Sequence, residues 1–357
     1  MEELPPIERL SHSQLTSYMD CGEKYRLTRR RGLAKDTSWA LLGGSAVHSW
    51  TELFDSSPVS PEPEYFIHLL DGLVEAAIAD ESMPQVVSRN DIRATGRASK
   101  EWPNKRNYDW WCVYGPRMCD AYAGWRARSD NLLLPPSWRV GEDFLVEERV
   151  EATVGGVDVL GFIDRVVLTS PESPDSPVIL DLKTGKEPGT VLQLATYARM
   201  WERMKGLPEG TVSRGAYVLV EKYDEFTEER TREWTEEELE GFEVERAERK
   251  RAIAAGEKDE NGEPLKPFRR PSKPKEKIVV ERACTLSDVM DIGAERFPAA
   301  YIDGLYAQAA AGINAGVYLP NPSSYCGSCV VRDMCGLYGN RLPDGVPMRE
   351  EGHAVAA

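Results

Sequence analysis

The fold is decided by the stretch Val178-Ile-Leu-Asp-Leu-Lys183, which reads as a short β-strand. Side chains of a strand point alternately to its two faces, so Asp181 and Lys183 share one face while Leu180 and Leu182 point into a core on the other. An acid and a lysine therefore lie side by side on one surface. Taken alone, this pattern favours an ordinary ion pair at a strand end, and its meaning depends on the residues around it.

A second carboxylate lies on the strand before it. Residues 144–154 and 157–168 are β-rich runs joined by Gly155-Gly156, a two-residue loop that can adopt the positive φ of a tight hairpin. In the second run, Asp164 falls on an otherwise apolar face, where a carboxylate needs a partner. A divalent cation shared with Asp181 is a suitable partner.

The expected chemistry is the hydrolysis of a phosphodiester bond. Carboxylate oxygens hold Mg²⁺ or Mn²⁺ with several waters left in place, and such a cation neutralises the charge that develops on phosphorus. We expect Lys183 to position the attacking water and to stabilise the transition state. Glu147 and Glu148, on the neighbouring strand, are left outside the predicted ligand set.

Three spaced motifs carry a family resemblance. Gly161-x-x-Asp164, Asp181-x-Lys183 and Gln193-x-x-x-Tyr197 resemble, in this order, the RecB-like branch of the PD-(D/E)XK nuclease superfamily. The resemblance implies a restriction-endonuclease-like α/β fold, with a mixed central sheet flanked by helices. It also implies that Gln193 and Tyr197 flank the metal site, where they orient Lys183 or the scissile phosphate, although a tyrosine on an amphipathic helix is commonly a core residue.

A histidine completes the predicted metal site. Gly44-x-x-x-His48 is similar to the metal-binding histidine segment of that branch, so the predicted ligands are His48, Asp164 and Asp181. An imidazole among oxygen ligands shifts the preference of a site from Mg²⁺ toward Mn²⁺.

The chain ends in a cysteine motif, Cys326-x2-Cys329-x5-Cys335, and Cys21 lies far upstream. Four thiolates bind either zinc or an iron–sulfur cluster. A zinc ribbon normally shows two close cysteine pairs, whereas here one ligand is remote. Together with the resemblance to iron–sulfur members, the CRISPR-associated exonuclease group and the helicase-nuclease AddB type, the motif predicts a [4Fe–4S] cluster that joins the N- and C-terminal segments. The other cysteines are expected to be simply buried: Cys112, Cys119 and Cys284.

Domain organisation follows from these motifs, which extend over most of the 357 residues. We expect one nuclease domain over residues 1–340 and a flexible tail over 341–357. Within the domain we expect a helical insertion at 56–140, a charged insertion at 222–285 and the cysteine loop at 321–338.

Two helices are predicted near the N-terminus. Ser11 and Gln14 are spaced as a capping box, which predicts a helix that runs through Cys21 to about Leu27. Gly43-Gly44 is expected to open a second helix, over residues 45–54, that carries His48.

The net charge of −15 is unusual for a protein that binds nucleic acid, because affinity for DNA comes mostly from Lys and Arg. A DNA path must then be a local basic groove. Solvated faces and a linker are the alternative reading of its candidates, which are Arg26, Arg29, Arg30, Arg31, Arg269 and Arg270. No run approaches the roughly 20 apolar residues that span a bilayer, and no signal peptide is evident, so we expect a cytoplasmic protein with no membrane partner.

The predicted function is that of a metal-dependent DNA exonuclease on single-stranded DNA or DNA ends, in recombination, replication or repair, in a phage or a CRISPR context. No Gly-x4-Gly-Lys-Ser/Thr motif occurs, so we expect a separate partner such as a helicase, an annealing protein or an integrase. The alternative is a catalytically silent iron–sulfur subunit that binds DNA or acts as a scaffold in a helicase-nuclease complex.

Overall fold

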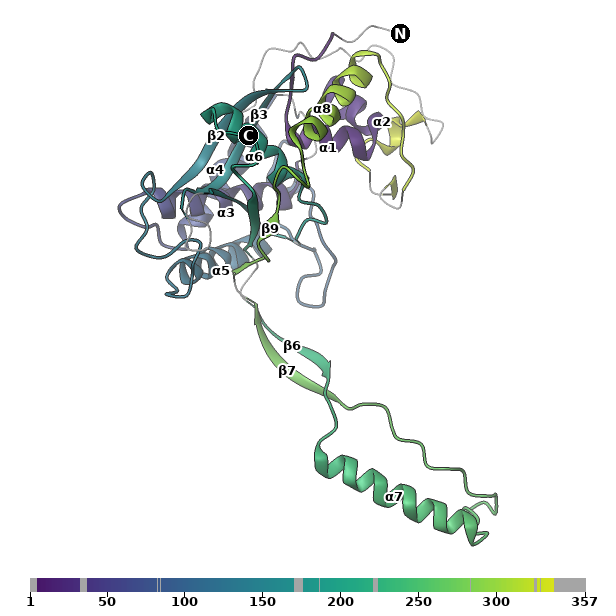
Figure 1. Ribbon diagram of the computed structural model, residues 1–357. Helices are drawn as coiled ribbons and strands as arrows, with labels where there is room; N and C mark the ends of the chain where they lie inside the picture. Colours follow the sequence, from purple (N-terminus) through teal and green to yellow (C-terminus); the bar gives the residue numbers. More distant parts are fainter. Residues whose placement is uncertain are drawn as a thin grey trace. The chain divides into compact units, whose positions relative to one another are not determined.

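The computed structural model describes residues 5–32, 37–81, 83, 85–169, 176–185, 187–220, 224–282, 284–323, 326–327 and 329–336, with the backbone alone for 224–230 and 276–282. The predicted tail, 341–357, lies outside the described residues. The chain divides into two compact units, one made of Met1–Tyr223 and Ala283–Ala357 and the other of Asp224–Arg282. Figure 1 labels their elements.

The first unit contains a seven-stranded sheet. Its strands are β1 (Arg9–Leu10), β2 (Phe144–Val154), β3 (Val157–Val167), β4 (Val178–Lys183), β5 (Arg214–Leu219), β8 (Thr285–Leu286) and β9 (Met290–Asp291). The predicted hairpin is confirmed: β2 and β3 are antiparallel, and Gly155 and Gly156 have φ of 60° and 80°. β4 is antiparallel to β3 and parallel to β5. The sheet is therefore mixed, as predicted.

One edge of β3 is only partly paired. β2 pairs along the whole of the other edge, whereas β4 pairs with residues 165–167 and β1 with residues 158–159. Within the described residues, no strand pairs with 160–164 on this edge. The side chain of Asp164 can therefore reach the backbone of β4.

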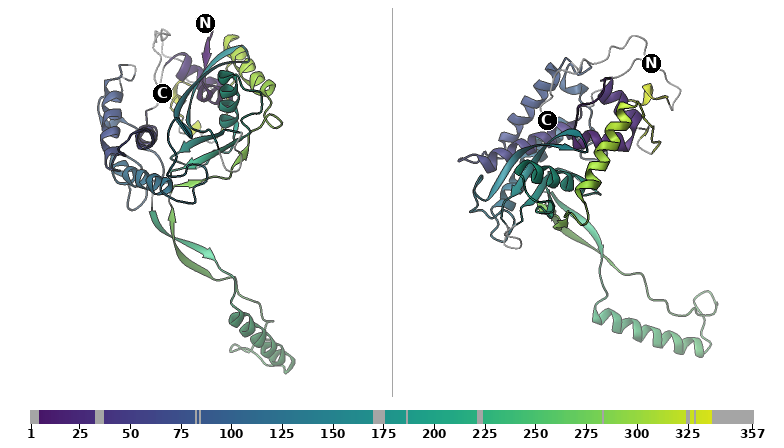
Figure 2. Two further views of the ribbon diagram at one scale, coloured as in Figure 1. Left: turned by 60° about the vertical axis from the view of Figure 1, so that its left-hand side comes forward. Right: turned by 45° about the horizontal axis from the view of Figure 1, so that its top comes forward.

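Helices cover both faces of the sheet (Figure 2). One face packs against α3 (Trp39–Ser56), α4 (Tyr65–Ala79) and α5 (Tyr108–Arg126), and the other against α1 (His12–Asp20), α6 (Leu192–Lys205) and α8 (Ala299–Asn314). Leu180 and Leu182 join the first core and Ile179 joins the second, as the strand period predicts. Residues 56–140 thus supply α4 and α5, which bury Trp110 and Trp111 against the sheet.

The first predicted helix is shorter than expected. Its capping box is confirmed, since Ser11 Oγ accepts from Gln14 N at 3.2 Å and Gln14 Oε1 accepts from Ser11 N at 2.8 Å. The helix ends at Asp20, because Cys21 is extended, with φ of −164°. α2 (Gly22–Tyr25) and a π-helix, η1 (Arg26–Arg30), follow. The break accommodates a second segment, whose Leu319 carbonyl accepts from the N–H of Gly22 at 3.0 Å.

The second predicted helix is longer than expected. α3 starts at Trp39, after a cap in which Ser38 Oγ accepts from Leu41 N at 3.4 Å. Gly43 lies inside the helix rather than at its start. A Cβ on Gly43 would lie 2.2 Å from the ring of Trp111, so this glycine permits close packing of α3 on α5 instead of a turn.

The second unit consists of an antiparallel pair, β6 (Asp224–Thr231) and β7 (Lys275–Arg282), and of α7 (Glu236–Ala254). It lies within the predicted charged insertion. At the start of α7, Thr235 and Glu238 form a capping box. Two short 3₁₀ turns, η2 (Arg89–Asp91) and η4 (Arg332–Met334), complete the regular elements that the structure describes. None of the described helices has the length and apolar content that a bilayer span requires.

Candidate active site

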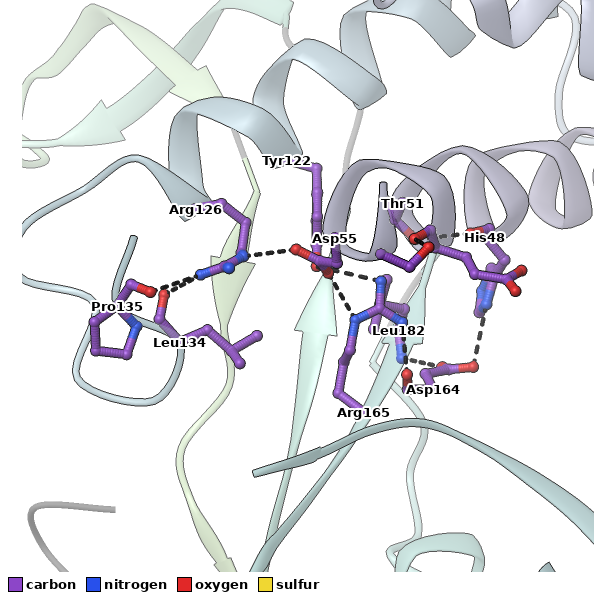
Figure 3. Close-up of polar contacts among 12 residues, drawn as sticks. His48, Thr51, Asp55, Tyr122, Arg126, Leu134, Pro135, Asp164, Arg165 and Leu182 are labelled. Atoms are coloured by element: carbon purple, nitrogen blue, oxygen red, sulfur yellow. Dashed lines mark hydrogen bonds and ion pairs between the residues drawn. The ribbon is translucent and has the colours of Figure 1, made fainter. Parts of the chain in front are cut away.

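The carboxylate of Asp164 connects three elements at the gap beside β3 (Figure 3). Its Oδ2 accepts the backbone N–H of Leu182 on β4, and its Oδ1 lies 3.3 Å from Nδ1 of His48 on α3. Asp164 is 8% exposed, and the side chain of His48 is 30% exposed. This buried position supplies the polar partners that the sequence requires for a carboxylate on an apolar strand.

A third residue completes a potential metal site. His48, Glu147 and Asp164 each offer one ligand atom, and these atoms lie within 4.8 Å of one another; in the described part of the chain, they are the group with this geometry. One imidazole nitrogen and two carboxylate oxygens fit Mn²⁺ or Mg²⁺. Glu147 therefore takes the place among the three that the sequence analysis assigned to Asp181.

The hairpin register contained the signal that would have found Glu147. The two-residue turn pairs Val154 with Val157, and counting back along both strands leaves Glu147 opposite Asp164. Glu148, the other acid considered, instead contacts Lys205 Nζ at 3.2 Å. The strand register thus assigns Glu147 to the site and Glu148 to the surface contact with Lys205, a distinction that residue type alone does not make.

The remaining predicted residues form a second cluster. Asp181 and Lys183 lie on the same side of β4, and α6 contributes Gln193 and Tyr197. Asp181 Oδ2 lies 2.5 Å from Lys183 Nζ, and Asp181 Oδ1 accepts from Gln193 Nε2 at 3.0 Å. Gln193 Oε1 accepts from Lys183 Nζ at 3.3 Å, and Gln193 Nε2 lies 3.4 Å from the hydroxyl of Tyr197. α6 thus brings one amide into contact with both the acid and the lysine, and Tyr197 is 8% exposed behind it.

The electrostatics of the site show a concentration of negative charge. Burial, and next the charge of Asp164, raise the pKa of both Glu147 and Asp181 to about 7. Burial also opposes ionisation of Asp164, but His48 and the Leu182 N–H lower its pKa overall. The pKa of His48 rises, because its neighbouring carboxylates outweigh the effect of burial. These acidic groups share one electrostatic environment.

His12 is a site residue that the sequence analysis missed. It is 7% exposed, and its ring lies edge-on to Tyr197, with centroids 6.4 Å apart. Burial, and next the positive charge of Lys183, lower the pKa of His12 to about 4, so the imidazole is neutral at pH 7. Its position directly after the Ser11 cap gives no sign of this location.

The four cysteines of the predicted cluster occupy neighbouring segments. Cys21 Sγ accepts from the backbone N–H of Asn321 at 3.5 Å, and the charge of Cys335 acts on Arg26, which follows α2. Their sulfur atoms do not form a group of ligand atoms like that around His48, as far as the described residues show. The iron–sulfur cluster therefore stays a prediction. No disulfide joins any of the seven cysteines, all of which the structure describes; Cys119 and Cys284 are buried, whereas Cys112 is only half-buried.

The predicted DNA-binding arginines differ in their surroundings. Arg26 forms two hydrogen bonds with Glu23, of 2.7 and 2.6 Å, and Arg30 is 7% exposed and donates to the Pro5 carbonyl. Arg29 is exposed and Arg31 is half-buried. The other predicted pair, Arg269 and Arg270, is exposed in the second unit. The burial of Arg30 removes its guanidinium from the surface that a phosphate would contact.

A comparison with protein families identifies the superfamily of this chain. The model of the PD-(D/E)XK nuclease superfamily matches residues 9–336. A comparison with curated proteins finds no match. The matched span contains every group described above, from His12 to Cys335. The chain belongs to the PD-(D/E)XK nuclease superfamily, which implies a metal-dependent phosphodiesterase.

Proposed function

We propose that this protein is a deoxyribonuclease that acts as an exonuclease on single-stranded DNA or on DNA ends, in recombination, replication or repair. One observation carries the proposal. Asp164 contacts His48 and stands opposite Glu147, while the adjacent strand presents Asp181 and Lys183, whose shared amide, Gln193, comes from α6. A metal-ligand group and a lysine for the reaction thus meet at one gap in the sheet.

The cation is proposed to be Mn²⁺ or Mg²⁺, held by His48, Glu147 and Asp164, with Asp181 as a further carboxylate. When bound, it supplies Lewis acidity and offsets the negative charge of a phosphodiester. Support comes from the raised pKa of Glu147 and Asp181, which reflects buried acids next to Asp164 with too little positive charge nearby. The imidazole favours Mn²⁺.

Lys183 is the proposed catalytic cation of the chain itself. Its ammonium group contacts Asp181 and Gln193, so it is held at a fixed place beside the acid. There it can orient the attacking water and stabilise the negative charge of the transition state. The amide of Gln193 holds Asp181 and Lys183 in place, and Tyr197 supports Gln193. The preserved acid and lysine disfavour a catalytically silent scaffold.

We also propose that Cys21, Cys326, Cys329 and Cys335 hold a [4Fe–4S] cluster with a structural role. The contact between Cys21 and Asn321 supports this assignment, because it brings the remote cysteine to the segment that leads into the cysteine loop. Zinc is the alternative occupant of four thiolates. A cluster bonded to both segments would join the two ends of the matched span.

DNA is the proposed partner, and a helicase, an annealing protein or an integrase is the proposed protein partner. The test uses 5′- and 3′-labelled single- and double-stranded DNA, with Mn²⁺, Mg²⁺ or EDTA. We expect metal-dependent release of mononucleotides or short products from ends, and none with Asp164→Ala. Cleavage in EDTA, or full activity of Asp164→Ala, would refute the nuclease site. Cleavage of circular DNA, which has no ends, would instead show that the enzyme is an endonuclease.

A further inference from the structure

A buried ionic cluster lies directly behind the metal-ligand group (Figure 3). At its centre is Asp55, whose side chain is 1% exposed. Asp55 Oδ1 accepts from Arg126 Nε at 2.8 Å, and Asp55 Oδ2 accepts from Arg165 Nε at 2.7 Å and from the Tyr122 hydroxyl at 2.6 Å. A buried carboxylate with three donors is fully held in place.

Asp55 is linked to the candidate metal ligands through its own helix. It follows His48 by seven residues in α3, which is two helical turns, so both side chains lie on one face. Thr51 lies between them with no exposed surface, and its hydroxyl donates to the His48 carbonyl at 2.8 Å. The position of Asp55 therefore determines where α3 presents His48.

Arg165 links the same cluster to the opposite ligand. It is fully buried and directly follows Asp164 in β3. Its Nη1 donates to the Asp164 carbonyl at 2.5 Å, while its Nε binds Asp55. One guanidinium thus holds both the helix that carries His48 and the peptide that carries Asp164.

Arg126 anchors the cluster on its other side. It is 7% exposed and extends from α5, where it donates to the carbonyls of Leu134 and Pro135. The cluster contains two guanidinium groups and one carboxylate, so it carries an excess positive charge next to the acidic site. The charge of Arg165 acts on Glu147 and favours its ionised form.

We infer that Asp55 and Arg165 are positioning residues of the metal site: their ion pair sets the separation between His48 and Asp164 that a divalent cation requires. This inference rests on the proposed function. Residues around a metal site commonly set ligand geometry, and their loss costs about 10- to 100-fold in metal affinity. The separation is sensitive because the two ligands come from different elements, α3 and β3, rather than from one.

The test measures Mn²⁺ affinity in the absence of DNA, by electron paramagnetic resonance of free Mn²⁺. We expect Asp55→Asn to raise the dissociation constant roughly tenfold or more. Glu202→Gln is the matched control, because Glu202 also forms a buried ion pair, with Arg199 at 3.0 Å, and accepts from the N–H of Val212 at 2.7 Å, and both partners lie outside α3 and the ligand set. It should lower the melting temperature comparably and leave the dissociation constant unchanged.

A second variant separates geometry from charge and remains informative if Asp55→Asn does not fold. Tyr122→Phe keeps every charge and removes the hydroxyl that donates to Asp55 at 2.6 Å and accepts from Arg165 Nη2 at 3.5 Å. We expect it to weaken Mn²⁺ binding about two- to fivefold. The inference is overturned if Tyr122→Phe and folded Asp55→Asn bind Mn²⁺ like the wild type, or if Glu202→Gln weakens binding equally.

A metal-free measurement distinguishes failure of this inference from failure of the proposed function. The ¹⁵N shifts of the His48 imidazole report its contact with Asp164, and they should change in Tyr122→Phe but not in Glu202→Gln. If the wild type binds no Mn²⁺, the proposed function fails, and the His48 shifts alone decide whether the cluster positions the imidazole. Unchanged shifts in Tyr122→Phe would refute that role.

Discussion

Glu147 stands across the β2–β3 hairpin from Asp164 with φ of 47°, a left-handed backbone conformation in the middle of a strand. The alternation of β2 shifts by one residue at this point: Leu145 and Val150 pack in the same core, although their positions differ by five, an odd number that would place them on opposite faces of a regular strand. Non-glycine residues with such a conformation cost on the order of 1–3 kcal/mol and occur preferentially at functional sites. The shift turns the Glu147 carboxylate toward the ligand group.

Glu147→Gln should lower the cleavage activity and raise the stability of the metal-free protein. The change removes a buried charge next to Asp164, so in EDTA at pH 8 we expect the metal-free protein to gain about 1 kcal/mol, measured by denaturant unfolding. Cleavage should fall about 10- to 100-fold, because a candidate metal ligand is lost. Glu148→Gln is the matched control and should change neither quantity much. Normal cleavage by Glu147→Gln would remove Glu147 from the site.

Stabilisation by Mn²⁺ should increase with pH. The pKa of Glu147 and of Asp181 rises from 4.5 and 3.8 to about 7 on folding. Between their unfolded and folded values the folded protein binds more protons, so these groups make the metal-free protein less stable as pH rises to about 7. Mn²⁺ must displace the same protons. Thermal melts should therefore show a larger shift with Mn²⁺ at pH 8 than at pH 6, and an equal shift would contradict the coupling.

Asp181→Asn and Lys183→Ala should separate cleavage from binding. In the proposed mechanism Asp181 helps to hold the cation and Lys183 stabilises the transition state, so either change should lower cleavage at least about 100-fold. DNA affinity, measured by fluorescence anisotropy in EDTA, should stay within about threefold for Asp181→Asn, since a charge that repels phosphate is lost. Tyr197→Phe should lose less, about tenfold or under, because the proposed role of Tyr197 is to support Gln193. Full activity of Lys183→Ala would exclude its catalytic role.

Metal content tests the cysteine proposal. Purified protein should be brown with broad visible absorbance, and Cys21→Ala should lose the colour and melt at a lower temperature. Cys112→Ala, which changes a half-buried thiol outside the proposed set, should keep the colour. Asp181→Asn should also stay brown while inactive. If anaerobic purification gave colourless, fully active protein with stoichiometric zinc, the four cysteines would hold zinc and not an iron–sulfur cluster.

The salt dependence of DNA binding tests the basic segment after α2. Charge reversal at exposed Arg29 should weaken binding to all sequences and reduce the slope of log affinity against log salt by roughly one unit. Arg26→Gln is the comparison, because Arg26 is already paired with Glu23 and should contribute less. An unchanged slope for Arg29 would place the DNA path elsewhere, and Arg269 and Arg270 would be tested next.

Much of this site follows from local sequence rules. The period of a strand placed Asp181 with Lys183, and the spacing of a helix placed Gln193 near Tyr197. The roles of Asp55 and His12 could not be found in this way, because each depends on the packing of a helix against a distant strand. The break at Cys21 has the same cause: the segment around Leu319 competes with continuation of the helix, and no local propensity contains that information.

The insertion between β5 and β8 also affects how the sheet forms. Val218 and Leu219 pair with Leu286 and Thr285 across a long stretch of chain, and closing a loop of that length by random search is slow and entropically costly. The β6–β7 pair brings Asp224 opposite Arg282, so a preformed hairpin shortens the effective loop to a few residues. By the logarithmic dependence on loop length, this moves about 2 kcal/mol of the closure cost from the β5–β8 pairing to the formation of the second unit. The edge of the nuclease sheet can then assemble almost as locally as an ordinary β-turn.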